Sequence, residues 1–156
     1  MDQVIFLDLE DTIIDEWSTA QIINAPKIRK FLRGQQHTDP IGIFSFAIYD
    51  DVDRMFFYSN MKQMIEDILG TYISHRMIPT MEEVIKVASY EKRIAPPMSE
   101  RDFYDFYDKR SAFEVYCSST SSFLDKKCIL VDDAVVNSRL ILDDREIVTL
   151  NVDELI

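Results

Sequence analysis

The chain has 156 residues, of which 47% are hydrophobic, and it contains only 3 glycines and 5 prolines. This length fits one domain spanning residues 1–156, and the composition excludes a low-complexity or loop-dominated chain. The formal net charge of −11 excludes a generic binder of nucleic acids or anionic membranes, because the protein's own field repels phosphates. The net charge does not exclude binding through a local basic patch, nor binding to a protein partner.

Four apolar runs have the length and composition of buried β-strands. In chain order they are Val4–Leu7, Ile41–Ile48, Cys128–Val131 and Glu146–Val152. Strands that alternate with helical patterns favour an α/β fold, with a doubly wound and mainly parallel sheet.

Helical patterns fill much of the remaining chain. They are expected at residues 26–33, from about residue 51 to residue 70, at Met81–Tyr90, and after Ser99. Thr80 with Glu83 resembles a capping box, and Ser99 with Asp102 is a second candidate cap. The helix after Ser99 contains an aromatic cluster that is expected to be mostly core, made up of Phe103, Tyr104, Phe106 and Tyr107. Met61, Met64, Ile65 and Ile68 recur at helical spacing and are expected to face the core. A loop is expected at residues 35–40, ahead of the second strand.

The expected location is the cytoplasm. The N-terminal sequence M-D-Q lacks the basic segment of a signal peptide, and no apolar run approaches the roughly 20 residues of a membrane span. Cys117 and Cys128 have no C-x-x-C spacing, so we expect two free thiols in a reducing compartment.

Two of the expected strands run directly into carboxylates. Asp8 and Glu10 follow the first strand, and Asp132 and Asp133 follow the third. Ligands of open parallel sheets bind at the carboxyl ends of strands, so neighbouring strands would bring these acids together. Carboxylates and water suit Mg²⁺, which predicts a magnesium site. Asp8 and Glu10 taken alone could instead be a solvated strand end, but the second acidic pair at Asp132 and Asp133 counts against this alternative.

The order of these features resembles the haloacid dehalogenase-like (HAD) superfamily of phosphotransferases. Its first motif is matched by D-L-E-D-T-I at residues 8–13, and its fourth by V-D-D-A-V-V-N at residues 131–137. The second motif, a strand ending in Ser or Thr, is matched by G-I-F-S, which ends at Ser45. Lys109 is the best match to the third motif, a basic residue ahead of the last site strand.

The resemblance implies a phosphatase that works through an aspartyl-phosphate. Asp8 would be the nucleophile, Ser45 would donate a hydrogen bond to a phosphate oxygen, and Lys109 would pair with both Asp8 and the phosphate. Taken alone, a serine in the position of Ser45 is more often a hydrogen-bonded strand serine than a phosphate ligand, and Lys109 taken alone is best explained as a surface lysine. Three other basic residues compete for the role given to Lys109: Lys92, Arg93 and Arg110.

The resemblance also implies a set of Mg²⁺ ligands. The Asp8 carboxylate, the backbone carbonyl of Glu10 and the Asp133 carboxylate would bind the ion, and Asp132 would reach it through water. Bound metal would offset the repulsion among these acids and take up charge during phosphoryl transfer.

Glu10 departs from the family pattern, in which the second acid of the first motif is Asp. That Asp protonates the leaving group and then activates water. One extra methylene displaces the carboxyl group, and a misplacement of about 1 Å can cost roughly 100-fold in rate. Glu10 therefore fits two hypotheses: a phosphatase with adjusted geometry, or a catalytically weak HAD-like protein that acts as a regulatory binding module.

The spacing between the motifs predicts little or no cap domain over the site. About 30 residues separate the first motif from Ser45, enough for a small flap and one helix. About 60 residues separate Ser45 from Lys109, enough for sheet, helices and a modest insertion. An open site would admit macromolecular substrates such as phosphoproteins or nucleic-acid ends.

Lys27, Lys30 and Arg33 share one side of the first expected helix. They are either a solvated helix face or a docking patch for an acidic protein or a nucleic-acid backbone. Asn137, at the end of the fourth motif, could be an ordinary helix cap.

Overall fold

A computed structural model describes residues 2–35, 39–142 and 145–156, and residues 36–38 of the expected loop lie outside this range. Within the described residues, five strands form one sheet with the order β2-β1-β3-β5-β4. The strands are β1 (Gln3–Leu7), β2 (Gly42–Ile43), β3 (Lys127–Asp132), β4 (Ser138–Leu142) and β5 (Arg145–Asn151). All neighbouring pairs are parallel except β4 with β5. The predicted α/β class with a mainly parallel sheet is confirmed.

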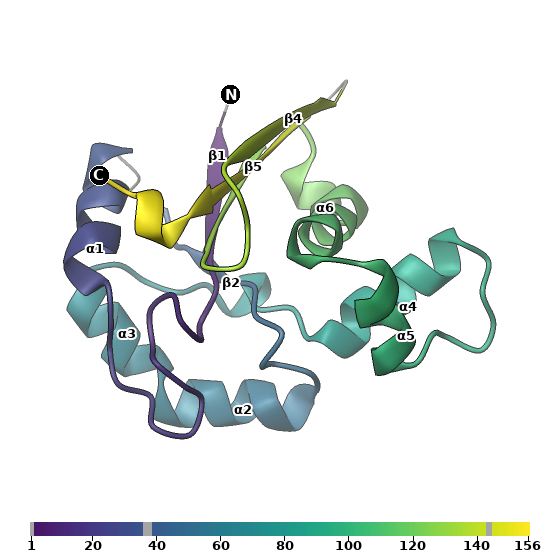
Figure 1. The fold of residues 1–156 in the computed structure, drawn as a ribbon, viewed down its shortest axis with the longest axis horizontal. Helices are drawn as coiled ribbons and strands as arrows, with labels where there is room; N and C mark the ends of the chain where they lie inside the picture. Colours follow the sequence, from purple (N-terminus) through teal and green to yellow (C-terminus); the bar gives the residue numbers. More distant parts are fainter. Residues whose placement is uncertain (1, 36–38, 143–144) are drawn as a thin grey trace.

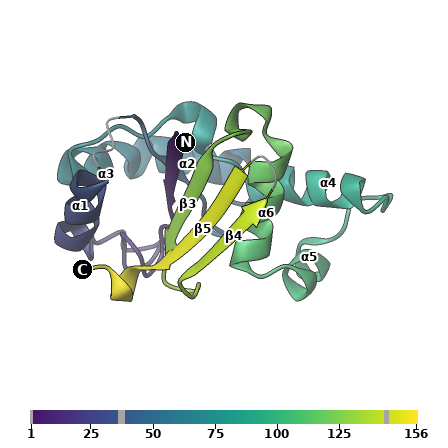
Figure 2. The same cartoon turned by 90° about the horizontal axis from the view of Figure 1, so that it is seen from above.

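Helices cover both faces of this sheet (Figures 1 and 2). They are α1 (Ala25–Gly34), α2 (Asp51–Asn60), α3 (Lys62–Leu69), α4 (Met81–Glu91), α5 (Glu100–Phe106) and α6 (Lys109–Ser119). Three short 3₁₀ turns complete the described elements: η1 (His75–Met77), η2 (Ser121–Phe123) and η3 (Val152–Glu154). Helices α1, α2 and α3 contribute to the core on one face, and α4, α5 and α6 contribute to the core on the other, where α4 packs on α6.

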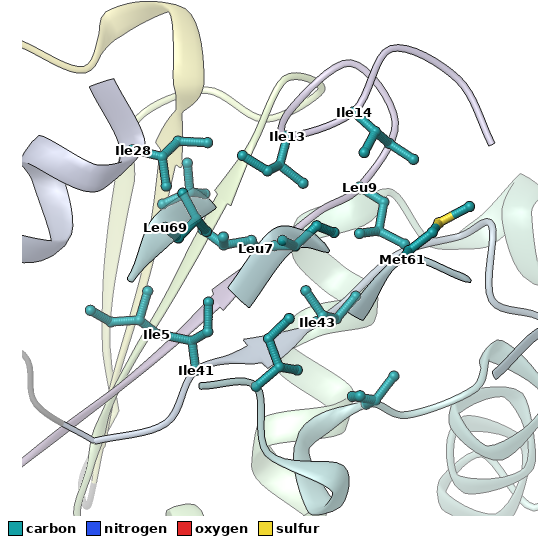
Figure 3. Packing of buried hydrophobic residues seen from close by; sticks show 14 of the residues in the cluster. Ile5, Leu7, Leu9, Ile13, Ile14, Ile28, Ile41, Ile43, Met61 and Leu69 are labelled. Carbon is teal, nitrogen blue, oxygen red and sulfur yellow. The ribbon is translucent and has the colours of Figure 1, made fainter. Parts of the chain in front are cut away.

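Alternating side chains of the central strands explain the two-sided core. In β1, Ile5 and Leu7 join the core on the α1 side, whereas Phe6 joins the core on the α6 side. Figure 3 shows Ile5 and Leu7 packed among residues of α1, α3 and the loop after β1. Because both faces are buried, β1 contains a continuous apolar run rather than an alternating one.

The second strand is much shorter than expected. Only Gly42 and Ile43 pair with β1, and the backbone turns after Phe44. Ser45 ends the ladder locally, because its hydroxyl accepts the Ala47 N–H at 3.1 Å and its carbonyl accepts the Ile48 N–H at 3.2 Å. Expecting a strand over residues 41–48 was therefore wrong beyond Ile43.

The helix expected from residue 51 to residue 70 is two helices that meet at Met61. Met61 leaves helical geometry, with φ of −126°, and α3 starts again at Lys62. Met61 and Ile65 are buried as expected, but Ile68 is 38% exposed, and Leu69 takes the core position instead.

Helix caps follow the expected pattern. Thr80 accepts the Glu83 N–H, while the Glu83 side chain accepts the Thr80 N–H, which forms a complete capping box at α4. Ser99 caps α5 by accepting the Asp102 N–H at 3.1 Å. In α5, Phe103 is buried and Phe106 is 78% exposed, so the aromatic cluster is partly core.

Gly42→Ala is expected to destabilise the protein by about 2 kcal/mol, because an added methyl group overpacks the core. A Cβ at this position would collide with the Phe6 ring and lie 2.7 Å from the Met77 carbonyl oxygen. The Phe6 ring has little freedom to move, since edge contacts with Phe113 and Phe123 hold it at 5.4 and 5.7 Å. Urea unfolding measures the change.

Gly34→Ala is the matched control for this prediction. Within the described part of the chain, no heavy atom lies within 4 Å of a Cβ built at Gly34, which is the last residue of α1. Its free energy of unfolding should stay unchanged or rise slightly, because Ala favours helix over Gly. Equal destabilisation by the two substitutions would contradict the packing argument.

Both cysteines are free thiols, as expected, and the structure buries both of them. Among the described residues, no helix has the length and apolarity that crossing a membrane requires.

Candidate functional site

The ends of β1 and β3 bring two acidic segments to one edge of the sheet. The two strands are parallel neighbours, with Leu7 opposite Val131, so that Asp8 and Asp132 occupy the next position on each strand. The Asp8 N–H donates to the Val131 carbonyl at 3.0 Å, which continues the ladder into the acidic segment. The expected meeting of the two strand ends is observed.

Three carboxylates converge at this edge. One oxygen from each of Asp8, Asp132 and Asp133 lies within 4.8 Å of the other two. Asp8 and Asp132 are buried, with exposed fractions of 6% and 0%, whereas Asp133 is partly exposed. Such a concentration of like charge requires nearby positive charge.

Lys109 supplies positive charge within the cluster. Its Nζ lies 2.9 Å from Asp8 Oδ1 and 2.8 Å from Asp132 Oδ2. Burial opposes the charged ammonium, but Asp8 and Asp132 outweigh this effect and raise the pKa of Lys109. Of the four basic residues considered from the sequence, Lys109 is therefore the one that the fold places against Asp8.

Local structure fixes the Lys109 ammonium. Lys109 is the first residue of α6, whose N-cap Asp108 accepts the Ser111 N–H at 2.8 Å. The ammonium also lies 4.7 Å from the centre of the Phe46 ring, a cation–π distance. Helix α6 was not expected from the sequence, although Asp108 is a favourable N-cap residue.

Burial makes the acidic cluster unfavourable in its ionised form. It raises the pKa of Asp8 to about 7, although Lys109 opposes this shift. It also raises the pKa of Asp133, and repulsion from Asp132 adds to the effect. Three carboxylates against one ammonium leave an excess of negative charge when all are ionised.

Thr12 joins the two acidic segments, a role that the sequence analysis missed. Its hydroxyl accepts the Asp133 N–H at 3.1 Å and lies 3.2 Å from Asp8 Oδ2 and 3.5 Å from Asp133 Oδ1. The hydroxyl has one proton, and the Asp8 oxygen is the nearer acceptor. The threonine of D-L-E-D-T-I was the signal that could have revealed this contact.

Asparagines hold the loop that carries Asp133. The Asn151 side-chain amide donates to the carbonyls of Asp133 and Val135 at 3.2 and 2.8 Å. Asn137 accepts the Asn151 N–H at 2.7 Å and donates to Glu154 at 2.9 Å. Asn137 therefore braces this loop, and the alternative of a helix cap is wrong because β4 follows it directly.

Ser45 and Glu10 both lie at this site, and the Glu10 carboxylate is already hydrogen-bonded to the backbone there. Both line a solvent-accessible pocket of about 210 Å³, together with Asp8, Lys109 and Asp133. Glu10 Oε2 accepts the Trp17 N–H at 2.8 Å, so one oxygen is committed to the backbone of the loop after β1. Glu10 does not belong to the group of three converging carboxylates.

The basic residues of α1 form no ion pair among the described residues. Lys30 and Arg33 are exposed, and Lys27 is partly exposed. This arrangement is compatible with either reading of the patch, a solvated face or a docking surface.

The donor set fits a small divalent cation. Asp8 and Asp133 offer hard oxygen ligands, which Mg²⁺ prefers, and Asp132 is close enough to act through water. The negative charge left over after pairing with Lys109 is what a divalent ion would offset. The Glu10 carboxylate, in contrast, is directed to the Trp17 N–H.

No family model, curated protein or solved structure matches this chain. The assignment of a function to this site therefore depends on the contacts described above.

Proposed function

We propose that this protein is a HAD-like, Mg²⁺-dependent phosphomonoesterase that acts through Asp8. The proposal rests on the buried Asp8 carboxylate. Its Oδ1 lies 2.9 Å from Lys109 Nζ, and it converges with the carboxylates of Asp132 and Asp133. A nucleophilic carboxylate beside a fixed ammonium and a hard-cation site suits phosphoryl transfer.

The proposed reaction has two displacement steps. An Asp8 oxygen attacks phosphorus, the bond from phosphorus to the ester oxygen breaks, and the departing alkoxide takes a proton. Water then attacks the aspartyl-phosphate, which releases inorganic phosphate, yields a proton and regenerates Asp8. Lys109 and the Ser45 hydroxyl would stabilise the phosphoryl oxygens throughout, and Glu10 is the candidate for proton transfer.

Bound Mg²⁺ would neutralise charge on the phosphoryl oxygens. Asp8, Asp133 and the Glu10 carbonyl would hold the ion, with Asp132 reaching it through water. Because Asp132 already pairs with Lys109 at 2.8 Å, it would keep the ammonium in place when the charge on Asp8 changes.

Two features of the fold support a HAD-like protein with little or no cap. The site lies where β1 and β3 end side by side, which is where a parallel sheet binds its ligands. Helices α4 and α5 contribute Met81, Val84 and Phe103 to the core on the α6 side. These helices therefore share one core with α6, which is what a protein with little or no cap would show.

Phosphate release from p-nitrophenyl phosphate tests the proposal. The purified protein should release phosphate slowly with millimolar Mg²⁺, lose this activity in EDTA, and regain it when excess Mg²⁺ is added. In Asp133→Asn, the Mg²⁺ concentration that gives half-maximal phosphate release should rise about tenfold or more, because a proposed ligand loses its charge. Asp105→Asn, which changes an exposed acid of α5, should behave like the unmodified protein. Release that is indifferent to EDTA would contradict the proposal.

A second candidate, a catalytically weak module that binds a macromolecule, is favoured by one contact. Glu10 Oε2 accepts the Trp17 N–H at 2.8 Å, so the side chain expected to move protons is engaged in holding a loop. In this case Lys27, Lys30 and Arg33 would contact an acidic partner. Charge reversal at these three residues would then abolish binding, whereas Asp8→Asn would leave it intact.

A further inference from the structure

Helix α2 exposes an apolar face beside the candidate site. Val52, Met55 and Phe56 are 76%, 60% and 44% exposed, and they share one side of the helix. Trp17, from the loop after β1, lies against Phe56 with ring centres 5.4 Å apart. These four residues are called the α2–Trp17 surface below. A cluster of exposed apolar side chains of this kind is typical of an interaction site.

Two connections join the α2–Trp17 surface to the site. The Trp17 N–H donates to Glu10, which lines the site pocket. Ser45 lines the same pocket, and the chain leads from it through a short turn into α2. Figure 1 shows α2 and the loop after β1 together beneath the carboxyl ends of the strands. A ligand in the pocket could therefore extend onto this surface.

The surroundings of this surface are acidic. The loop after β1 contains Asp11, Asp15 and Glu16, and the sequence has no Lys or Arg before Lys27. On α2, Arg54 pairs with Asp51 and Glu83, so its positive charge is already matched. An apolar surface bordered by negative charge complements a segment with apolar and basic side chains.

We propose that the α2–Trp17 surface binds a basic and apolar segment next to the phosphorylated residue of a protein substrate. This inference rests on the proposed function, because the phosphoryl group would occupy the Asp8 pocket while the flanking segment contacts α2. Apolar flanking residues would pack on Met55 and Phe56, and Lys or Arg would face Asp11 and Glu16. A nucleic acid fits poorly, since its backbone would meet the same carboxylates.

Binding of phosphoserine peptides to the Asp8→Asn protein tests this inference. Fluorescence anisotropy would compare three labelled peptides: one flanked by Leu and Arg, one with each Arg replaced by Glu, and one with each Leu replaced by Ser. The first should bind about tenfold more tightly than either of the others, because charge and apolar contact both contribute. Equal affinities, or tighter binding of a 5′-phosphorylated oligonucleotide, would overturn the proposal.

Matched double variants locate the binding surface. Val52→Gln with Met55→Gln should weaken binding of the Leu and Arg peptide about tenfold. Tyr90→Gln with Phe106→Gln is the control, since these side chains are at least as exposed, at 85% and 78%, but belong to α4 and α5, which contribute to the other core. Equal losses in the two variants would overturn the assignment to α2.

The outcome for peptide binding can be separated from the outcome for catalysis. In the protein that retains Asp8, Val52→Gln with Met55→Gln should leave p-nitrophenyl phosphate hydrolysis unchanged and raise KM for the peptide. If the unmodified protein hydrolyses nothing, the proposed function fails, and the anisotropy comparison still decides whether α2 binds the peptide.

Discussion

Asp8→Asn is expected to lower Mg²⁺-dependent phosphate release by roughly 1,000-fold or more, because loss of a nucleophile removes the covalent route. The amide is nearly the same shape as the carboxylate but cannot form an aspartyl-phosphate. The Lys109 ammonium retains its 2.8 Å contact with Asp132, so the fold should persist. Initial rates with p-nitrophenyl phosphate measure the effect, and circular dichroism checks folding.

Asp11→Asn is a matched control for this substitution. Asp11 also lines the site pocket, but it is exposed and does not belong to the group of three converging carboxylates. Its activity should stay within about threefold of the unmodified protein, as expected for an exposed acid that bonds to no reacting atom. An Asp8→Asn protein that retained full activity would eliminate Asp8 as the nucleophile.

Glu10→Asp is expected to raise turnover by roughly 100-fold, because shortening the side chain moves its carboxyl group back toward the pocket. Asp is one methylene too short to keep the present contact with the Trp17 N–H, so its carboxylate would be free to transfer a proton. The gain should be greater for glycerol phosphate than for p-nitrophenyl phosphate. Nitrophenolate leaves readily without protonation, whereas a glycerol alkoxide requires a proton.

Glu10→Gln separates proton transfer from loop support in this experiment. The Gln carbonyl can still accept the Trp17 N–H, but the amide cannot act as an acid or base. Turnover of glycerol phosphate should therefore fall or stay low in Glu10→Gln. If Glu10→Asp and Glu10→Gln gave the same rate, Glu10 would have no role in proton transfer, and the binding-module hypothesis would gain support.

The parts of the fold that follow from periodic patterns could be predicted from the sequence. The apolar runs that became β1, β3 and β5 predicted a mainly parallel sheet, and Thr80 with Glu83 marked the start of α4. The parts that depend on long-range contacts could not. Strand β4 has alternating exposure and is stabilised by pairing with β5, which its local sequence does not specify.

The same division holds at the candidate site. The positions of Asp8 and Asp132 after two apolar strands were enough to predict that they would meet, because parallel neighbours end at one edge. The contact of Glu10 with Trp17 depends on how the loop after β1 folds back, in a segment with no clear periodicity. Spacing alone also could not choose Lys109 over Lys92, since that choice depends on where α6 begins.

The bond from Asn137 to Glu154 has a practical consequence for biochemical work on this protein. It links the loop that carries Asp133 to Glu154, the last residue of η3. Trimming the chain within η3 would remove this bond without removing any of the proposed acidic ligands. Rate constants should therefore be compared between protein that retains η3 and protein trimmed within it.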